Sequence, residues 1–112
     1  MSARTQTLLW IGQRASAAVL ALCVVVHLCT IIYAVRGGLT GAEILGRTRG
    51  NGGWLVFYAL FVVAVAVHVP IGLRAILSEW LGWRGTSRDV ALALFAVFLL
   101  GFGLRAVTGL FA

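Results

Sequence analysis

Three long apolar segments, divided by short stretches that carry most of the charges, set the strongest limit on what this chain can fold into. They cover residues 15–35, 54–73 and 90–112, and the third contains a single charge, Arg105. A helix that crosses a bilayer needs about 20 mainly apolar residues. Each segment meets that length. We therefore expect one domain, an all-α bundle of three transmembrane helices at about residues 15–35, 54–78 and 90–111.

The composition favours a membrane protein and excludes the common soluble classes. Of the 112 residues, 62% are hydrophobic and 11% are charged, whereas a soluble domain has about 45–50% apolar and about 25% charged residues. All nine basic residues are arginines, and they lie around the apolar segments instead of forming one cluster. This distribution is typical of charges that flank membrane helices. We predict a lipid bilayer as partner and no nucleic acid.

The arginines also give a weak prediction of orientation. With three spans, the N-terminal segment and the second connection lie on the same side of the membrane and carry five of the nine: Arg4, Arg14, Arg74, Arg84 and Arg88. The opposite side carries Arg36, Arg47, Arg49 and Arg105. Because basic residues favour the cytoplasmic side, we expect a cytoplasmic N-terminus.

The first connection contains a helix-start signal. Thr40 is followed three residues later by Glu43, which fits a capping box with Thr40 as the N-cap. A short helix to about Gly46 is one interpretation, and a plain polar loop is the other. The second connection carries Trp80 and Trp83, which are typical of an aromatic anchor at the membrane surface.

The two histidines are the most informative residues, because both fall inside predicted spans. His27 lies in the first and His68 in the second. Ionisable side chains in hydrocarbon are costly and usually mark function, although a histidine can also serve as a structural hydrogen-bonder between helices. Small residues lie one helical turn from each histidine, for example Cys23 and Gly72. They leave room for a flat ligand or for close helix packing.

Haem suits two intramembrane imidazoles better than zinc does. Zinc takes about four ligands, and Cys23 beside His27 gives only an incomplete set. Haem needs one or two axial ligands and has an apolar ring. Counted from the flanking arginines, the two histidines differ in depth by about 10 Å. We therefore expect two haems whose second ligands come from another chain, with one haem as the alternative, and Thr30 as a partner of His27.

The second apolar segment resembles a known family. His68 is followed by Gly72, Arg74 and Glu79, four, six and eleven residues later. This spacing resembles the membrane-anchor cytochrome b subunits of succinate dehydrogenase and fumarate reductase. The segment Gln13–Ala17 is similar to the family's His-Arg-x-Ser-Gly sequence, with Gln13 in place of His and Ala17 in place of Gly.

The resemblance implies site residues for haem b and quinone. It implies that His68 binds the proximal haem b and His27 the distal one. Arg14 and Ser16, together with Trp10, are candidates to line a quinone pocket, although each could equally be an interfacial or helix-start residue. Arg74 could pair with a haem propionate, or it could simply extend its charge to the headgroups.

The resemblance also implies partners. They are a flavoprotein that carries out the dicarboxylate chemistry, an iron–sulfur subunit and a second membrane-anchor subunit. This chain would then be a non-catalytic subunit of a quinone-linked oxidoreductase, integral to a membrane such as the bacterial inner membrane. Two other functions stay open. One is a haem-free structural anchor, and the other is a small transporter or proton channel with titrating histidines.

Overall fold

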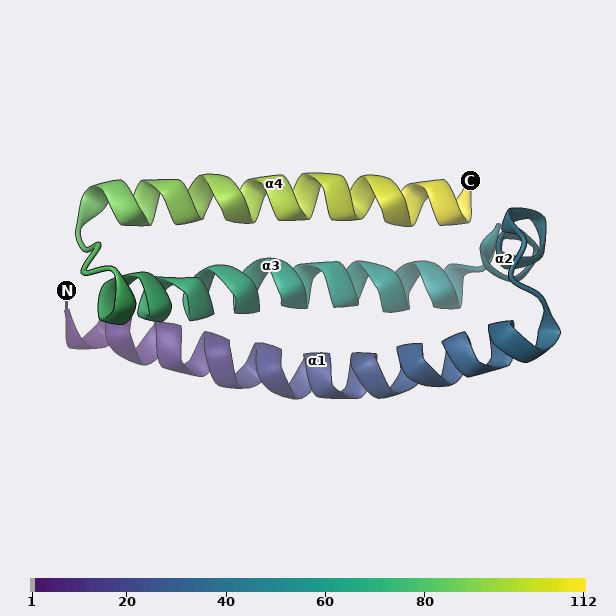
Figure 1. Ribbon diagram of the computed structural model, residues 1–112, viewed down its shortest axis with the longest axis horizontal. Helices are drawn as coiled ribbons and strands as arrows, with labels where there is room; N and C mark the ends of the chain where they lie inside the picture. The colour runs from purple at the N-terminus through teal and green to yellow at the C-terminus, as the bar shows by residue number, and fades with distance from the viewer. Residues whose placement is uncertain (1) are drawn as a thin grey trace.

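The computed structural model describes residues 2–112 and forms them into four helices, shown in Figure 1. These are α1 (Ala3–Gly37), α2 (Gly41–Thr48), α3 (Gly52–Trp80) and α4 (Thr86–Phe111). Helices α1, α3 and α4 are each long and apolar enough to cross a membrane. Helix α3 lies between α1 and α4 and packs against both. The all-α fold with three candidate spans is confirmed.

The ends of the chain follow the expected topology. The N-terminus lies at the same end of the bundle as the α3–α4 connection, whereas α2 and the C-terminus lie at the other end (Figure 1). Because α1 and α3 run in opposite directions, residues early in α1 face residues late in α3. This antiparallel order determines which side chains can meet in the interior.

Helix α1 begins well before its apolar segment does. The sequence predicts a start near residue 15, but the helix starts at Ala3, where the Ser2 hydroxyl accepts a hydrogen bond from the Thr5 N–H. At about 1.5 Å per residue, its 35 residues measure about 52 Å, whereas the hydrocarbon core is about 30 Å thick. The apolar pattern marks the part that fits in lipid, and a side-chain cap sets where the helix begins.

The short helix α2 closes one end of the bundle. Thr40 is its N-cap, as predicted, and accepts a hydrogen bond from the Glu43 N–H. The Thr48 hydroxyl donates to the Leu110 carbonyl at 2.9 Å, and the backbone N–H of Gly50 donates to the Phe111 carbonyl at 2.8 Å. The last carbonyls of a helix have no partner within it. The end of α2 and the segment after it therefore supply partners to the last carbonyls of α4.

A polar cluster joins α3 and α4 at the opposite end. Arg88 is buried and donates hydrogen bonds to the Ser78 hydroxyl and the Asp89 carboxylate. Asp89 also lies 3.5 Å from Nε of Arg74 on α3. An isolated buried guanidinium would be costly, so these partners explain why the first turn of α4 stays beside the last turns of α3.

Between these ends, α3 and α4 approach closely at one glycine. A Cβ atom added to Gly103 would lie 2.5 Å from Cγ1 of Val62, whereas one added to Gly101 would meet nothing within 4 Å. We expect Gly103→Ala to lower the free energy of unfolding by about 1–3 kcal/mol, because an overpacked contact must be relieved.

Gly101→Ala is the matched control for this prediction. It should leave stability unchanged or raise it slightly, since alanine is the better helix former. Denaturation of the purified chain in detergent, followed by circular dichroism, measures both variants. Equal stability of the two would contradict the close contact between Gly103 and Val62.

Candidate functional site

The candidate site lies along the interface between α1 and α3. The face of α1 that the sequence predicts to be small and mildly polar is turned inward there, with Ser16 and Cys23 buried. Ala64 is buried on α3, and Gly12 of α1 lies close to Ile71 of α3. Small side chains allow the two helices to approach, and this brings the polar groups of one helix within reach of the other.

His68 is held by a hydroxyl on the neighbouring helix. Its Nδ1 lies 3.4 Å from Oγ of Ser16 on α1, and the Ser16 hydroxyl donates its proton to the Gln13 carbonyl at 3.1 Å. A serine hydroxyl has one proton to donate, so while it donates to Gln13 it can accept a hydrogen bond from Nδ1–H of His68. In that tautomer the lone pair of His68 is on Nε2, where it can bind a metal.

His27 makes the same kind of contact with the helices exchanged, because here the imidazole is on α1 and the hydroxyl is on α3. Its Nδ1 lies 3.4 Å from the hydroxyl of Tyr58 on α3, and its ring stands edge-on to the rings of Tyr58 and Phe61. The Tyr58 hydroxyl can accept the Nδ1 proton, which leaves Nε2 of His27 with its lone pair.

The prediction that Thr30 is the partner of the His27 ring is wrong. The Thr30 hydroxyl donates to the backbone carbonyl of His27 at 2.7 Å and not to the ring, because a threonine in a helix readily bonds the carbonyl of the preceding turn. No sequence pattern pointed to Tyr58, which lies 31 positions away from His27. Tyr58 can be found only when the register of the two antiparallel helices is known. When Ser16 of α1 lies opposite His68 of α3, Tyr58 of α3 lies opposite His27 of α1.

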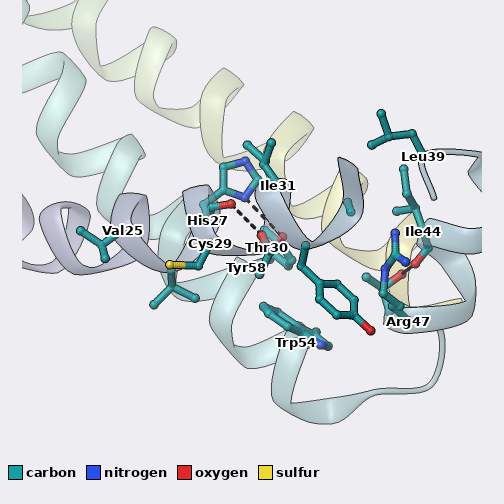
Figure 2. Close-up of a pocket in the computed structure, with 14 residues that line it drawn as sticks. Val25, His27, Cys29, Thr30, Ile31, Leu39, Ile44, Arg47, Trp54 and Tyr58 are labelled. Atoms are coloured by element: carbon teal, nitrogen blue, oxygen red, sulfur yellow. Dashed lines mark hydrogen bonds between the residues drawn. The ribbon is translucent and has the colours of Figure 1, made fainter. Parts of the chain in front are cut away.

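Two largely apolar grooves meet at His27. One, of about 640 Å³, is bordered by α1, α2 and the start of α3. Figure 2 shows His27, Thr30 and Tyr58 along this groove, with Arg47 and Ile44 of α2 at its end. The other, of about 500 Å³, lies between α3 and α4 and includes Phe61 and Phe102. Both volumes fall within the range of cofactor pockets.

The two histidines lie at clearly different levels. Ser16, which contacts His68, is 11 residues before His27 on α1, or about 16 Å along the helix. Tyr58, which contacts His27, is ten residues before His68 on α3, or about 15 Å. The stagger expected from the sequence is present and is larger than expected. Two nitrogens so far apart cannot bind the same iron.

The remaining predicted site residues lie apart from the imidazoles. Arg14 is exposed, and its guanidinium lies 5.3 Å from the centre of the Trp10 ring. Arg74 pairs with Asp89. Within residues 2–112, no three side chains of the metal-binding types gather. The idea of a cysteine–histidine zinc site therefore gains no support.

Comparison with known families now identifies the chain. A family model described as "Succinate dehydrogenase/Fumarate reductase transmembrane subunit" matches residues 1–107. The chain belongs to this family. No curated protein and no solved structure matches it. The resemblance drawn from the spacing after His68 is confirmed.

As a transmembrane subunit of the succinate dehydrogenase/fumarate reductase family, the chain is an integral membrane protein that works with partner subunits. One side-chain acceptor at the α1–α3 interface is left without a donor. Oε1 of Gln13, on the same face of α1 as Ser16, is buried and has no hydrogen-bond partner among residues 2–112, and Nε2 of Gln13 is close to Gly72. A buried acceptor without a donor is unusual, and it lies in the segment that resembles the family's His-Arg-x-Ser sequence.

Proposed function

We propose that this subunit binds haem b through His27 and His68 and helps to pass electrons between an iron–sulfur subunit and quinone. The observation that carries the proposal is the reciprocal orientation of the two imidazoles. Ser16 of α1 fixes His68 of α3, and Tyr58 of α3 fixes His27 of α1, in each case through Nδ1. Metal-binding histidines are commonly oriented in this way by a partner on the other ring nitrogen.

The surroundings of His27 fit a haem. The grooves beside it are lined mainly by aliphatic and aromatic side chains, which suit the apolar face of a porphyrin. The part of the chain that the structure describes has no histidine other than His27 and His68. We infer that each haem takes its second axial ligand from another membrane subunit and that the two haems lie at different depths.

The proposal assigns a role to each residue of the candidate site. Haem iron, when bound, accepts and releases one electron. Nε2 of His27 and of His68 would bind the two irons, and Ser16 and Tyr58 would hold the rings in the ligating tautomer by accepting the Nδ1 protons. At His27, the two apolar grooves would exclude water from the face of the haem. Arg74 is a candidate to meet an acidic side arm of the haem at His68, in competition with Asp89.

The N-terminal end of the α1–α3 interface is the proposed quinone region. Gln13 offers a buried acceptor there, next to Arg14 and Ser16. A quinol hydroxyl could donate to Oε1 of Gln13. The flavoprotein and iron–sulfur partners would lie on the cytoplasmic side of the bacterial inner membrane, at the end of the bundle that holds the N-terminus.

A reduced-minus-oxidised spectrum of the purified complex tests the proposal. We expect the bands of b-type haem. Their absence from a complex that still contains all its subunits would instead support a haem-free structural anchor. Uptake or proton flux in vesicles that contain this chain alone would support the transporter function.

The hydroxyl of Tyr58 provides a finer prediction. Tyr58→Phe keeps the ring beside His27 and removes only the partner of Nδ1. We expect the haem at His27 to bind about 10–100-fold more weakly, as when other second partners of metal-bound histidines are lost. Haem retention during dilution in detergent measures the change.

Tyr33→Phe is the matched control, because Tyr33 lines the same groove and its ring lies beside Arg47, not beside a histidine. It should retain haem about as well as the unchanged protein does. Equal haem retention in the two variants would contradict the role of Tyr58.

A further inference from the structure

The groove beside His27 ends at a cation that the family resemblance does not involve. Arg47 of α2 borders this groove together with His27, Tyr33 and Thr48. Figure 2 shows Arg47 at the α2 end, with its side chain extending toward the groove residues of α1. The groove is otherwise mainly apolar, so this half-buried guanidinium is its main charged feature.

Arg47 is held firmly in place by contacts that leave most of its hydrogen-bond donors available. One terminal nitrogen donates to the Gly38 carbonyl at 2.8 Å, and the guanidinium carbon lies 5.5 Å from the centre of the Tyr33 ring. A guanidinium has five N–H donors, and the Gly38 bond uses one of them. Tyr33 is six residues beyond His27, or about 9 Å along α1.

The charge of Arg47 has no acidic partner within the described chain. Glu43 lies one helical turn earlier on α2, but its carboxylate accepts from the Thr40 hydroxyl. No ion pair joins Arg47 to a carboxylate among residues 2–112. A cation at the edge of an apolar groove favours an anionic partner, and a guanidinium can bind a carboxylate with two parallel hydrogen bonds.

We propose, on the basis of the haem-binding function above, that Arg47 binds an acidic side arm of the haem held by His27. Imidazole and guanidinium then grip the same ligand from two elements, α1 and α2. This arrangement would point the acidic edge of that haem toward the α2 end of the bundle. It would also raise the reduction potential, because the cation offsets negative charge near the iron.

Substitution of Arg47 in the whole complex tests this proposal. Arg47→Gln removes the charge, and Arg49→Gln makes the same change at an exposed residue two positions on. The haem at His27 is recognised as the one whose signal is lost in His27→Ala. In a redox titration of this haem, we expect R47Q to shift the ratio of reduced to oxidised haem about tenfold toward the oxidised form. For a one-electron couple this is about 59 mV. R49Q should leave the ratio unchanged.

The rate of haem loss and a conservative variant distinguish the effect of the Arg47 charge from a structural effect of the substitution. R47Q should release this haem about tenfold faster to a haem-scavenging protein, and Arg47→Lys should restore most of the potential. R47K also decides the matter if R47Q fails to assemble. A lysine variant that assembles but has the potential of R47Q, or an R47Q potential equal to that of R49Q, would overturn the proposal.

The lipid composition distinguishes an acidic side arm of the haem from a lipid phosphate as the anionic partner of Arg47. The measurements are made in vesicles of neutral lipid and in vesicles that contain anionic lipid. An R47Q effect that occurs only with anionic lipid would assign Arg47 to a lipid phosphate and would contradict the haem assignment. Absence of b-type haem from the unchanged complex would refute the proposed function itself, which is a different outcome.

Discussion

Replacing His27 with alanine should remove one haem from the purified complex and leave the other in place, and replacing His68 should do the reverse. The reason is the separation of about 15 Å along the helices, which prevents the two imidazoles from serving one iron. The haem-to-subunit ratio, measured after extraction, should fall by one in each single variant. The double variant His27→Ala/His68→Ala should contain neither haem.

The controls for these variants are neighbours that make no ring contact. Cys29→Ala changes an exposed residue in the groove beside His27, and Val67→Ala changes an exposed residue next to His68. Both should keep two haems. Added imidazole should partly restore the haem in His27→Ala, because the grooves give it access. Loss of both haems from either single variant would argue against separate sites.

Loss of Arg88 should be the most damaging change outside the haem sites. Arg88→Met keeps much of the aliphatic packing but removes the hydrogen bonds to Ser78 and Asp89. We expect the free energy of unfolding to fall by about 3 kcal/mol, since hydrogen bonds of a charged group are worth more than neutral ones. Denaturation in detergent, followed by circular dichroism, measures the loss.

Arg84→Met is the matched control for Arg88. Arg84 is exposed in the connection before α4, and an exposed substitution changes stability by about 0.5 kcal/mol or less. The haem content of both variants should match the unchanged protein, because the cluster contains neither imidazole. If the two substitutions cost the same, the cluster does not hold α3 and α4 together.

The number of spans could be predicted from the sequence because a bilayer imposes a simple rule, and the same rule makes the two histidines site candidates. A long uncharged segment that crosses the bilayer as a single span is a helix. A histidine inside such a helix is costly and usually marks function. The start of α2 was also predictable, since Thr40 and Glu43 form a local cap that needs no information about the rest of the fold.

The contacts of the histidines could not be predicted in the same way. Tyr58 and Ser16 reach their imidazoles only through the register of α1 against α3, which depends on the packing of small residues such as Gly12. Proximity along one helix instead suggested Thr30, which uses its hydroxyl on its own backbone. The proposed role of Arg47 depends on the position of α2 as well, which no periodic pattern provides.

Helix α4 is fastened at both of its ends, and this limits how the molecule can move. Arg88 and Asp89 attach its first turn to α3, and Thr48 and Gly50 hold its last carbonyls. We therefore expect helices α3 and α4 to move together. If haem binds as proposed, we expect any adjustment to the oxidation state of its iron at the border with α1, where the Ser16 hydroxyl can follow the His68 ring by rotating about a single bond.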